Sequence, residues 1–140
     1  MEIVAETMSA SGATGHESLT VLIVDDDYAI VGGLVEFFED EGFDVVTAAD
    51  GQAALDLLRR GLLPCAIVLD LMMPRMNGWE FRHEQLQDRD LKDIPTVVVS
   101  AVRLDPAARA QLGDVDYLPK PPSLPRLLAA VRRHCGEDFQ

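Results

Sequence analysis

AIVLDLMMPRMNG, at residues 66–78, decides the fold that this sequence predicts. Four apolar residues in succession are typical of a strand covered on both faces, as in a parallel sheet. Asp70 follows directly, and a loop that contains proline and glycine comes after it. Open α/β sheets bind their ligands at the carboxyl ends of their strands. The stretch therefore predicts an α/β fold with a functional carboxylate at Asp70.

Three further apolar runs also end in polar side chains. Residues 21–24 lead to Asp25 and Asp26, residues 96–99 to Ser100, and residues 115–119 to Lys120. Parallel strands end at one edge of their sheet, so three acids, a hydroxyl and an ammonium should meet there. Two carboxylates about 4 Å apart repel by about 4 kcal/mol at an effective dielectric constant of 20, which predicts a neutralising cation. Oxygen ligands with room for water favour Mg²⁺, and the whole set suits a phosphoryl group.

The segments between these runs have helical periodicity. Apolar residues recur at helical spacing in three of them: Ile30, Leu34, Phe37 and Phe38; Ala54, Leu57 and Leu58; Leu124, Leu127, Leu128 and Val131. Gly42 suits the position after the first helix, and 43–48 is a further strand-like run. Asp105 and Pro106 suit the cap and first turn of a short helix that ends before Gly113. The order (βα)₅ predicts a doubly wound, flavodoxin-like sheet of five parallel strands.

A helix that starts near Trp79 is the least regular of the five. Trp79, Phe81 and Leu86 do not fall on one helical face. The apolar pattern therefore leaves open which side of this helix packs against the sheet.

The composition indicates one domain, which we place at residues 19–136 between a flexible tail at 1–18 and a short tail at 137–140. The net charge of −12 argues against direct contact with nucleic acid or an anionic membrane. Residues 1–18 lack the pattern of a signal peptide, and no apolar stretch approaches the roughly 20 residues of a membrane span. Cys65 and Cys135 have no metal or redox spacing, so both are expected to be reduced in a cytosolic protein.

A simpler interpretation accompanies each candidate residue. The acids at 25–27 would suit the start of the first helix as caps, and Ser100 would suit a cap as well. Lys120 would be an ordinary surface lysine, although a cis bond to Pro121 would turn it back toward Asp70. Tyr117 would be a packed aromatic residue. The shared position at strand ends favours the functional interpretation for the acids, Lys120 and Ser100.

Five short motifs are similar to those of a known family. They are the Asp25-Asp26 pair, Asp-Gly-x-x-Ala-Leu at 50–55, Asp-x-x-Met-Pro-x-Met-x-Gly at 70–78, Ser100-Ala101 and Tyr117-x-x-Lys120-Pro121. Over residues 20–134 the chain resembles the receiver domain of bacterial two-component response regulators. Each motif alone is weak, but together, in this order and at fitting strand ends, they are specific. The resemblance implies a (βα)₅ receiver fold.

The resemblance implies that Asp70 is the phosphoacceptor for a phosphohistidine on a sensor histidine kinase or a histidine phosphotransfer protein, as in a phosphorelay. It implies that Mg²⁺, or Mn²⁺ in its place, is held by Asp26, Asp70 and the Met72 carbonyl, with Asp25 acting mainly through a metal-bound water. Such a domain is a signalling phosphoacceptor, not an enzyme in the usual sense, although it catalyses its own phosphorylation and dephosphorylation.

The resemblance also assigns the phosphoryl contacts and the switch. Lys120 would pair with the phosphoryl oxygens, and so would the Ser100 hydroxyl and the backbone at Leu71, Met72 and Ala101. Ser100 and Tyr117 would be the switch residues that change a protein-interaction face. Met72 and Val102 would border the path of water to the phosphorylated aspartate. Both are apolar, so a long-lived aspartyl phosphate is expected.

The chain departs from the family pattern between Ser100 and Gly113, where it is shorter than usual. The fourth helix should therefore be truncated or displaced, which leaves the choice of partner open. Pro122 also follows Pro121, where an aromatic or apolar residue is more usual.

The expected partners are the kinase or phosphotransfer protein and a downstream protein target, in the cytoplasm. The short polar ending favours a stand-alone, chemotaxis-regulator-like receiver over a piece of a longer regulator. Two alternatives remain at this point: a degenerate receiver that only docks, and a phosphatase of the haloacid dehalogenase type, whose first motif Asp25-x-Asp27 superficially resembles.

Overall fold

A computed structural model describes residues 19–136, so the predicted tails at 1–18 and 137–140 lie outside the described residues. Strands and helices alternate throughout. In chain order they are β1 (Thr20–Val24), α1 (Tyr28–Asp40), β2 (Asp44–Ala48), α2 (Gly51–Arg59), β3 (Ala66–Leu69), α3 (Gly78–Gln87), β4 (Thr96–Ser100), α4 (Pro106–Leu112), β5 (Asp116–Pro119) and α5 (Leu124–Cys135). The predicted (βα)₅ order is confirmed. Within the described residues, no helix is both long and apolar enough to cross a bilayer.

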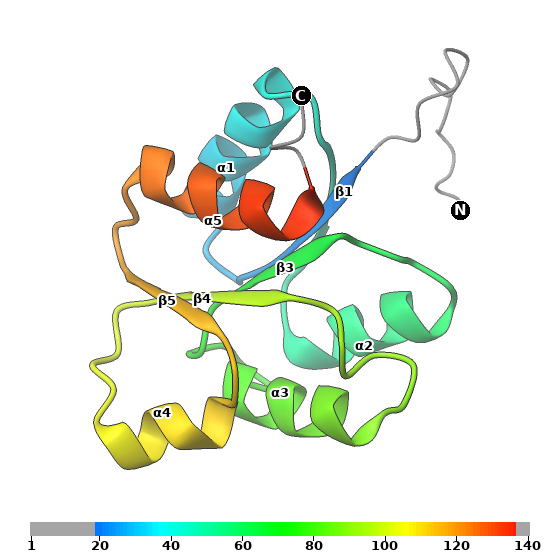
Figure 1. Cartoon of the computed structure of the whole chain (residues 1–140), viewed down its shortest axis with the longest axis vertical. Coiled ribbons are helices and arrows are strands. Elements are labelled where there is room, and N and C mark those ends of the chain that lie inside the picture. Colours follow the sequence, from blue (N-terminus) through cyan, green and yellow to red (C-terminus); the bar gives the residue numbers. More distant parts are fainter. Residues whose placement is uncertain (1–18, 137–140) are drawn as a thin grey trace.

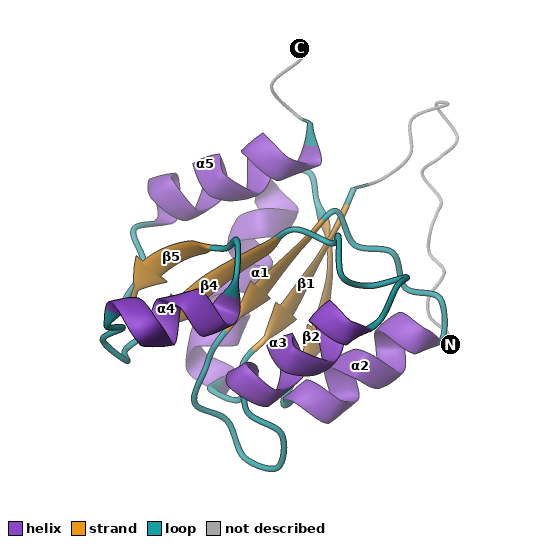
Figure 2. Ribbon diagram, turned by 60° about the horizontal axis from the view of Figure 1, so that its bottom comes forward, coloured by secondary structure: helices purple, strands orange, loops and turns teal. Residues whose placement is uncertain are grey.

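The five strands form one parallel sheet in the order β2-β1-β3-β4-β5. Helices α1 and α5 lie on one face, and α2, α3 and α4 lie on the other (Figures 1 and 2). This is the doubly wound arrangement that the sequence predicts. Because all strands run the same way, their carboxyl ends meet at a single edge, which we call the carboxyl edge.

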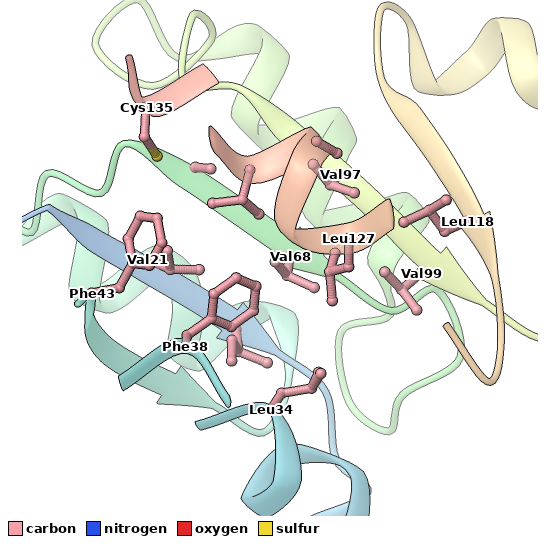
Figure 3. Close-up of a cluster of buried hydrophobic side chains, with 14 residues drawn as sticks. Val21, Leu34, Phe38, Phe43, Val68, Val97, Val99, Leu118, Leu127 and Cys135 are labelled. Carbon is pink, nitrogen blue, oxygen red and sulfur yellow. The ribbon is translucent and has the colours of Figure 1, made fainter. Parts of the chain in front are cut away.

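Two apolar layers cover the faces of the sheet, and successive strand residues point into opposite layers. Val21 and Ile23 pack with Phe38 of α1 and Leu127 of α5, as Figure 3 shows in part. Leu22, between them, packs in the layer under α2 and α3. Burial on both faces explains why the strands are continuously apolar instead of alternating.

Polar residues fix the ends of the helices. Asp27 caps α1 by accepting from the backbone amides of Ala29 and Ile30, at 3.1 and 3.3 Å. Asp105 caps α4 at 2.8 Å with Pro106 in the first turn, as predicted. The short α4 that we expect is also found, since its seven residues make it the shortest of the five helices.

Helix α3 buries polar side chains, which explains its irregular apolar pattern. Its buried residues are Gly78, Phe81, Arg82 and Gln85, at ordinary helical spacing. The Arg82 guanidinium donates to the Leu112 carbonyl at the end of α4 (2.6 Å) and to the Gln85 side chain (2.9 Å). Arg82 therefore ties α3 to the carboxyl-terminal end of α4.

We expect Arg82→Met to lower the free energy of unfolding by about 3 kcal/mol, because it leaves buried acceptors without a donor. Urea denaturation monitored by circular dichroism measures this. Arg59→Met is the matched control: Arg59 is an exposed arginine whose ion pairs with Glu84 and Asp88 are 3.7 and 3.5 Å long, and its loss should cost less than about 1 kcal/mol. Equal losses in the two variants would contradict the role given to Arg82.

Cys65 and Cys135 form a disulfide, so the expectation of two reduced cysteines is wrong for this structure. The bond joins the segment before β3 to the last residue of α5, with 5.1 Å between the Cα atoms. The prediction failed because it used spacing along the chain, and these residues are 70 apart in sequence. Only the docking of α5 against the sheet brings them together.

Reduction should lower the free energy of unfolding by about 4 kcal/mol, since the bond closes a loop of about 70 residues in the unfolded chain. The measurement is urea denaturation with and without dithiothreitol. A Cys65→Ser/Cys135→Ser variant should have the same free energy of unfolding as the reduced protein, and dithiothreitol should not change it. If both thiols can be alkylated after the protein is unfolded without reductant, the disulfide is absent in solution.

Candidate functional site

The carboxyl edge brings the predicted acids together. Asp25 follows β1 and Asp70 follows β3, and the pairing of Val24 with Leu69 sets the two side by side. The Asp70 amide donates to the Val24 carbonyl at 2.9 Å, which holds it against the end of β1. The side chains of Asp25, Asp26 and Asp70 offer oxygen atoms that all lie within 4.8 Å of one another. Asp25 and Asp70 are buried and Asp26 is exposed.

The capping alternative applies to only one of the three consecutive acids. Asp27 caps α1 and lies outside the acidic cluster, whereas Asp25 and Asp26 belong to it. One Asp25 oxygen accepts from the Asp27 amide at 2.9 Å, which fixes the turn between the cluster and the helix. The local sequence thus separates helix capping from the cluster.

Lys120 lies at the acidic cluster. Its ammonium is 2.9 Å from an Asp25 oxygen and 3.4 Å from an Asp70 oxygen, and its side chain is only 15% exposed. The bond to Pro121 is cis, as the sequence allowed. Because two acids hold its ammonium and its side chain is largely buried, the alternative of an ordinary surface lysine is wrong.

Burial and charge shift the titration of this group of side chains. Burial raises the pKa of Asp70, and so does the negative charge of Asp25; the positive charge of Lys120 and the Met72 backbone offset part of this rise. Burial would lower the pKa of Lys120, but its hydrogen bonds and charge attraction to Asp25 and Asp70 outweigh burial and raise it. Two buried acids thus share one cation, and the site has a surplus of negative charge.

Ser100 ends β4, the strand beside β3, and Tyr117 lies on β5, the strand beyond it. Ser100 is fully buried, and its hydroxyl oxygen accepts from the Val102 amide at 3.2 Å. The Tyr117 hydroxyl donates to the carbonyls of Val102 (2.6 Å) and Ser100 (3.2 Å). Tyr117 is also partly packed in the core, which agrees with the structural interpretation of this residue. The segment that follows β4 is thus tied to β5.

The donor set fits a magnesium ion. All of its side-chain ligands are carboxylate oxygens, and the exposed Asp26 leaves one side open to the water molecules that Mg²⁺ retains. The surplus negative charge at Asp25 and Asp70 is what a divalent cation would neutralise. Leu71, the residue after Asp70, is buried, and Met72 is 63% exposed.

The loop after Asp70 depends on features that our reading of the sequence missed. Gly78 is required because a Cβ atom there would overlap the Asp70 carbonyl oxygen and the Leu71 backbone. An ion pair between Arg75 and the buried Asp50 (2.6 Å) links this loop to the start of α2. Asp50 and Gly78 do stand in the quoted motifs, but no local pattern indicates the partner Arg75.

Comparison with known proteins agrees with this geometry. The profile of the response regulator receiver domain matches residues 21–132. Response regulator MprA of Mycolicibacterium vanbaalenii is 40% identical over 114 residues, which are 80% of this chain and 48% of that protein. Transcriptional regulatory protein CpxR of Escherichia coli is 38% identical over 114 residues, 80% of this chain and 47% of that protein. This chain belongs to the receiver-domain family of response regulators.

The structure of the Francisella response regulator 1452 receiver domain has the same fold. It covers 86% of this chain and 99% of its own, with a TM-score of 0.75 and 29% identity. This receiver domain spans about half the length of the curated relatives that it matches. The haloacid dehalogenase alternative is removed, because the family is a different one and Asp27, the second acid of that motif, caps a helix.

We expect Asp70→Asn to stabilise the metal-free receiver, because it removes one of two buried carboxylates and leaves Lys120 paired with Asp25. Urea midpoints in EDTA test this, with the exposed Asp44→Asn as the charge-matched control. The gain should be present at pH 7 and shrink as the pH falls through the raised pKa of Asp70, since the wild-type carboxyl is then neutral. Magnesium at a hundred times its Kd should add about 2.7 kcal/mol to the wild type and less to the variant.

Proposed function

We propose that this receiver domain accepts a phosphoryl group on Asp70 from a phosphohistidine of a sensor histidine kinase or a histidine phosphotransfer protein. The single observation that supports it best is the buried Asp70 carboxylate between Lys120 and two further acids. A carboxylate held in this way is a nucleophile with a fixed direction of attack. The surrounding charges can take up the charge of a transferring phosphoryl group.

The transfer needs little from the protein beyond orientation and electrostatics. An Asp70 oxygen forms a bond to phosphorus while the bond from phosphorus to the histidine nitrogen breaks. The electron pair of that bond stays on the imidazole. Lys120, already 3.4 Å from Asp70, would pair with the phosphoryl oxygens. The Ser100 hydroxyl and the backbone at Ala101, Leu71 and Met72 would hold the transferred group.

Asp26, Asp70 and the Met72 carbonyl would hold Mg²⁺, and Asp25 would act mainly through a metal-bound water. When bound, the ion neutralises the acids and disperses charge on the phosphoryl oxygens; Mn²⁺ would serve similarly. Lys120 alone balances only one of the two buried acids, so phosphorylation should depend on the metal. The domain would thus catalyse its own phosphorylation and dephosphorylation.

The signal would leave the site through the segment after β4. We expect the Ser100 hydroxyl, whose oxygen accepts from the Val102 amide in this structure, to move toward a phosphoryl group on Asp70. That movement disturbs the carbonyls of Ser100 and Val102, to which the Tyr117 hydroxyl is bonded. Phosphorylation would therefore shift the population of conformations on the face formed by α4 and β5.

We propose that a downstream protein reads this face, that the receiver itself contacts neither nucleic acid nor membrane, and that it acts in the cytoplasm beside its kinase. The surplus of 24 acidic over 12 basic residues supports a protein partner over nucleic acid. The competing function, docking without phosphorylation, would not require the acids, Ser100 and Lys120 together. Mg²⁺-dependent binding of beryllofluoride would exclude it.

Acetyl phosphate with Mg²⁺ should add one phosphoryl group to the wild-type chain, because the site supplies its own catalysis. Intact-mass spectrometry is the measurement. Asp70→Asn should not be labelled, and EDTA should abolish labelling of the wild type. Asp44→Asn, which removes an exposed acid of β2, should be labelled normally. Equal labelling of Asp70→Asn and wild type would contradict the assignment of Asp70 as the phosphoacceptor.

The aspartyl phosphate should be long-lived, because Met72 and Val102 offer no hydrogen bond to an attacking water. Met72 is 63% exposed at the site and Val102 is half-buried. A Met72→Asn/Val102→Glu variant should lose its phosphate about tenfold faster, which corresponds to about 1.4 kcal/mol of barrier. Phosphate release from purified phosphoprotein measures both rates. If the double variant decays no faster than its parent, these side chains do not set the lifetime.

A further inference from the structure

The loop between β3 and α3 is held by an ion pair that reaches it from another part of the chain. Arg75 Nε lies 2.6 Å from Asp50 Oδ2, and the two residues are 25 apart in sequence. The Asp50 side chain is only 8% exposed, whereas that of Arg75 is 67% exposed. The other Asp50 oxygen accepts from the Ala53 amide at 2.8 Å and caps α2. One buried carboxylate therefore serves both the helix and the loop.

Arg75 has a backbone conformation that a non-glycine residue rarely adopts. Its φ of 63° lies in the left-handed region, and no other non-glycine residue in the described part of the chain has a positive φ. That conformation costs roughly 1–2 kcal/mol for a residue with a Cβ atom. Such strain persists where the surroundings hold it, and it is frequent at functional sites. Here the ion pair with Asp50 is one of the contacts that hold it.

Two backbone contacts fix the loop on either side of this pair. The Gly51 amide donates to the Met76 carbonyl at 2.8 Å, and a Cβ atom at Gly51 would collide with Met76. The Gly78 amide donates to the Leu71 carbonyl at 3.0 Å. Met72 lies within the loop so closed, two residues after Asp70, and its backbone lowers the pKa of the Asp70 carboxyl.

We propose that Arg75 and Asp50 are positioning residues for the acidic site: their ion pair holds the β3–α3 loop so that the Met72 backbone faces Asp70 and the metal. The proposal rests on the proposed function, because it concerns the same site. The hydrogen bond from the Ala53 amide and the pairing with Arg75 together lower the pKa of Asp50, so the pair stays charged at neutral pH. Loss of the pair frees the loop, and the Met72 backbone, which would supply a ligand to the metal, becomes less ordered.

Electrostatics alone predicts the opposite effect from positioning. Arg75→Gly removes a positive charge near a cation site, which by itself would tighten Mg²⁺ binding. Glycine also adopts a positive φ freely, so the variant relieves backbone strain and should fold. Weaker Mg²⁺ binding in Arg75→Gly therefore separates positioning from a simple effect of charge.

The test is an NMR titration of the full ¹⁵N-labelled chain with MgCl₂, following the amides of Asp26, Asp70 and Met72. Arg75→Gly should raise the Kd for Mg²⁺ about tenfold, in the range seen when residues that support metal ligands are lost. Asp50→Ser, which can still cap α2, should do the same. The double variant should be little worse than either single variant, because both break one ion pair.

Arg59→Ala is the charge-matched control, since it removes an exposed arginine from the opposite end of α2, and its Kd should stay within twofold of the wild type. Without metal, amide exchange at residues 72–77 should be faster in Arg75→Gly than in the wild type or the control. If the wild type binds Mg²⁺ and Arg75→Gly binds it as tightly or more tightly, the positioning role is overturned. If Mg²⁺ shifts the amide signal of neither Asp26 nor Asp70 in the wild type, the proposed function is wrong, and so is the positioning role that rests on it.

Discussion

Two buried carboxylates that share one lysine are the constraint on which the rest of this structure depends. Asp25 and Asp70 lie at the ends of neighbouring strands, and Lys120 reaches both of them. An arrangement with surplus buried charge is stable only when several backbone contacts hold the charged residues in place. The parallel register supplies the first part of that support. The close approach of Gly78 to the Asp70 backbone supplies the second.

The sequence predicted those parts of the site that depend on strand ends, because a parallel sheet converts the end of each apolar run into a shared location. Asp70, Lys120 and the acid pair were found in this way, and the apolar periodicity was enough for the helices that bury only apolar residues. It failed for α3, whose buried side includes Arg82 and Gln85. Residue type alone does not distinguish a buried arginine from a solvated one.

The contacts that the sequence could not predict join residues that are distant along the chain and do not directly follow a strand. The disulfide of Cys65 with Cys135 and the pairing of Arg75 with Asp50 both depend on how helices dock on the finished sheet. Neither has a local spacing rule, so each becomes visible only when the tertiary structure is known. The positive φ of Arg75 is likewise invisible in the sequence, since glycine or asparagine is the usual sign of that conformation.

The anchoring of α4 by Arg82 limits how that helix can move. Its carboxyl-terminal end is fixed by the contact with the Leu112 carbonyl, while its amino-terminal end follows the segment that the Tyr117 hydroxyl holds. Arg109, in the middle of α4, also donates to the Val115 carbonyl at 3.4 Å, so these contacts hold the middle and the carboxyl-terminal end of the helix. Seven residues of helix are about 10 Å long, so the amino-terminal turn is the part of α4 that lies farthest from the Arg82 contact. A partner that distinguishes two orientations of α4 would therefore bind the helix near Asp105, at the end far from the Arg82 contact.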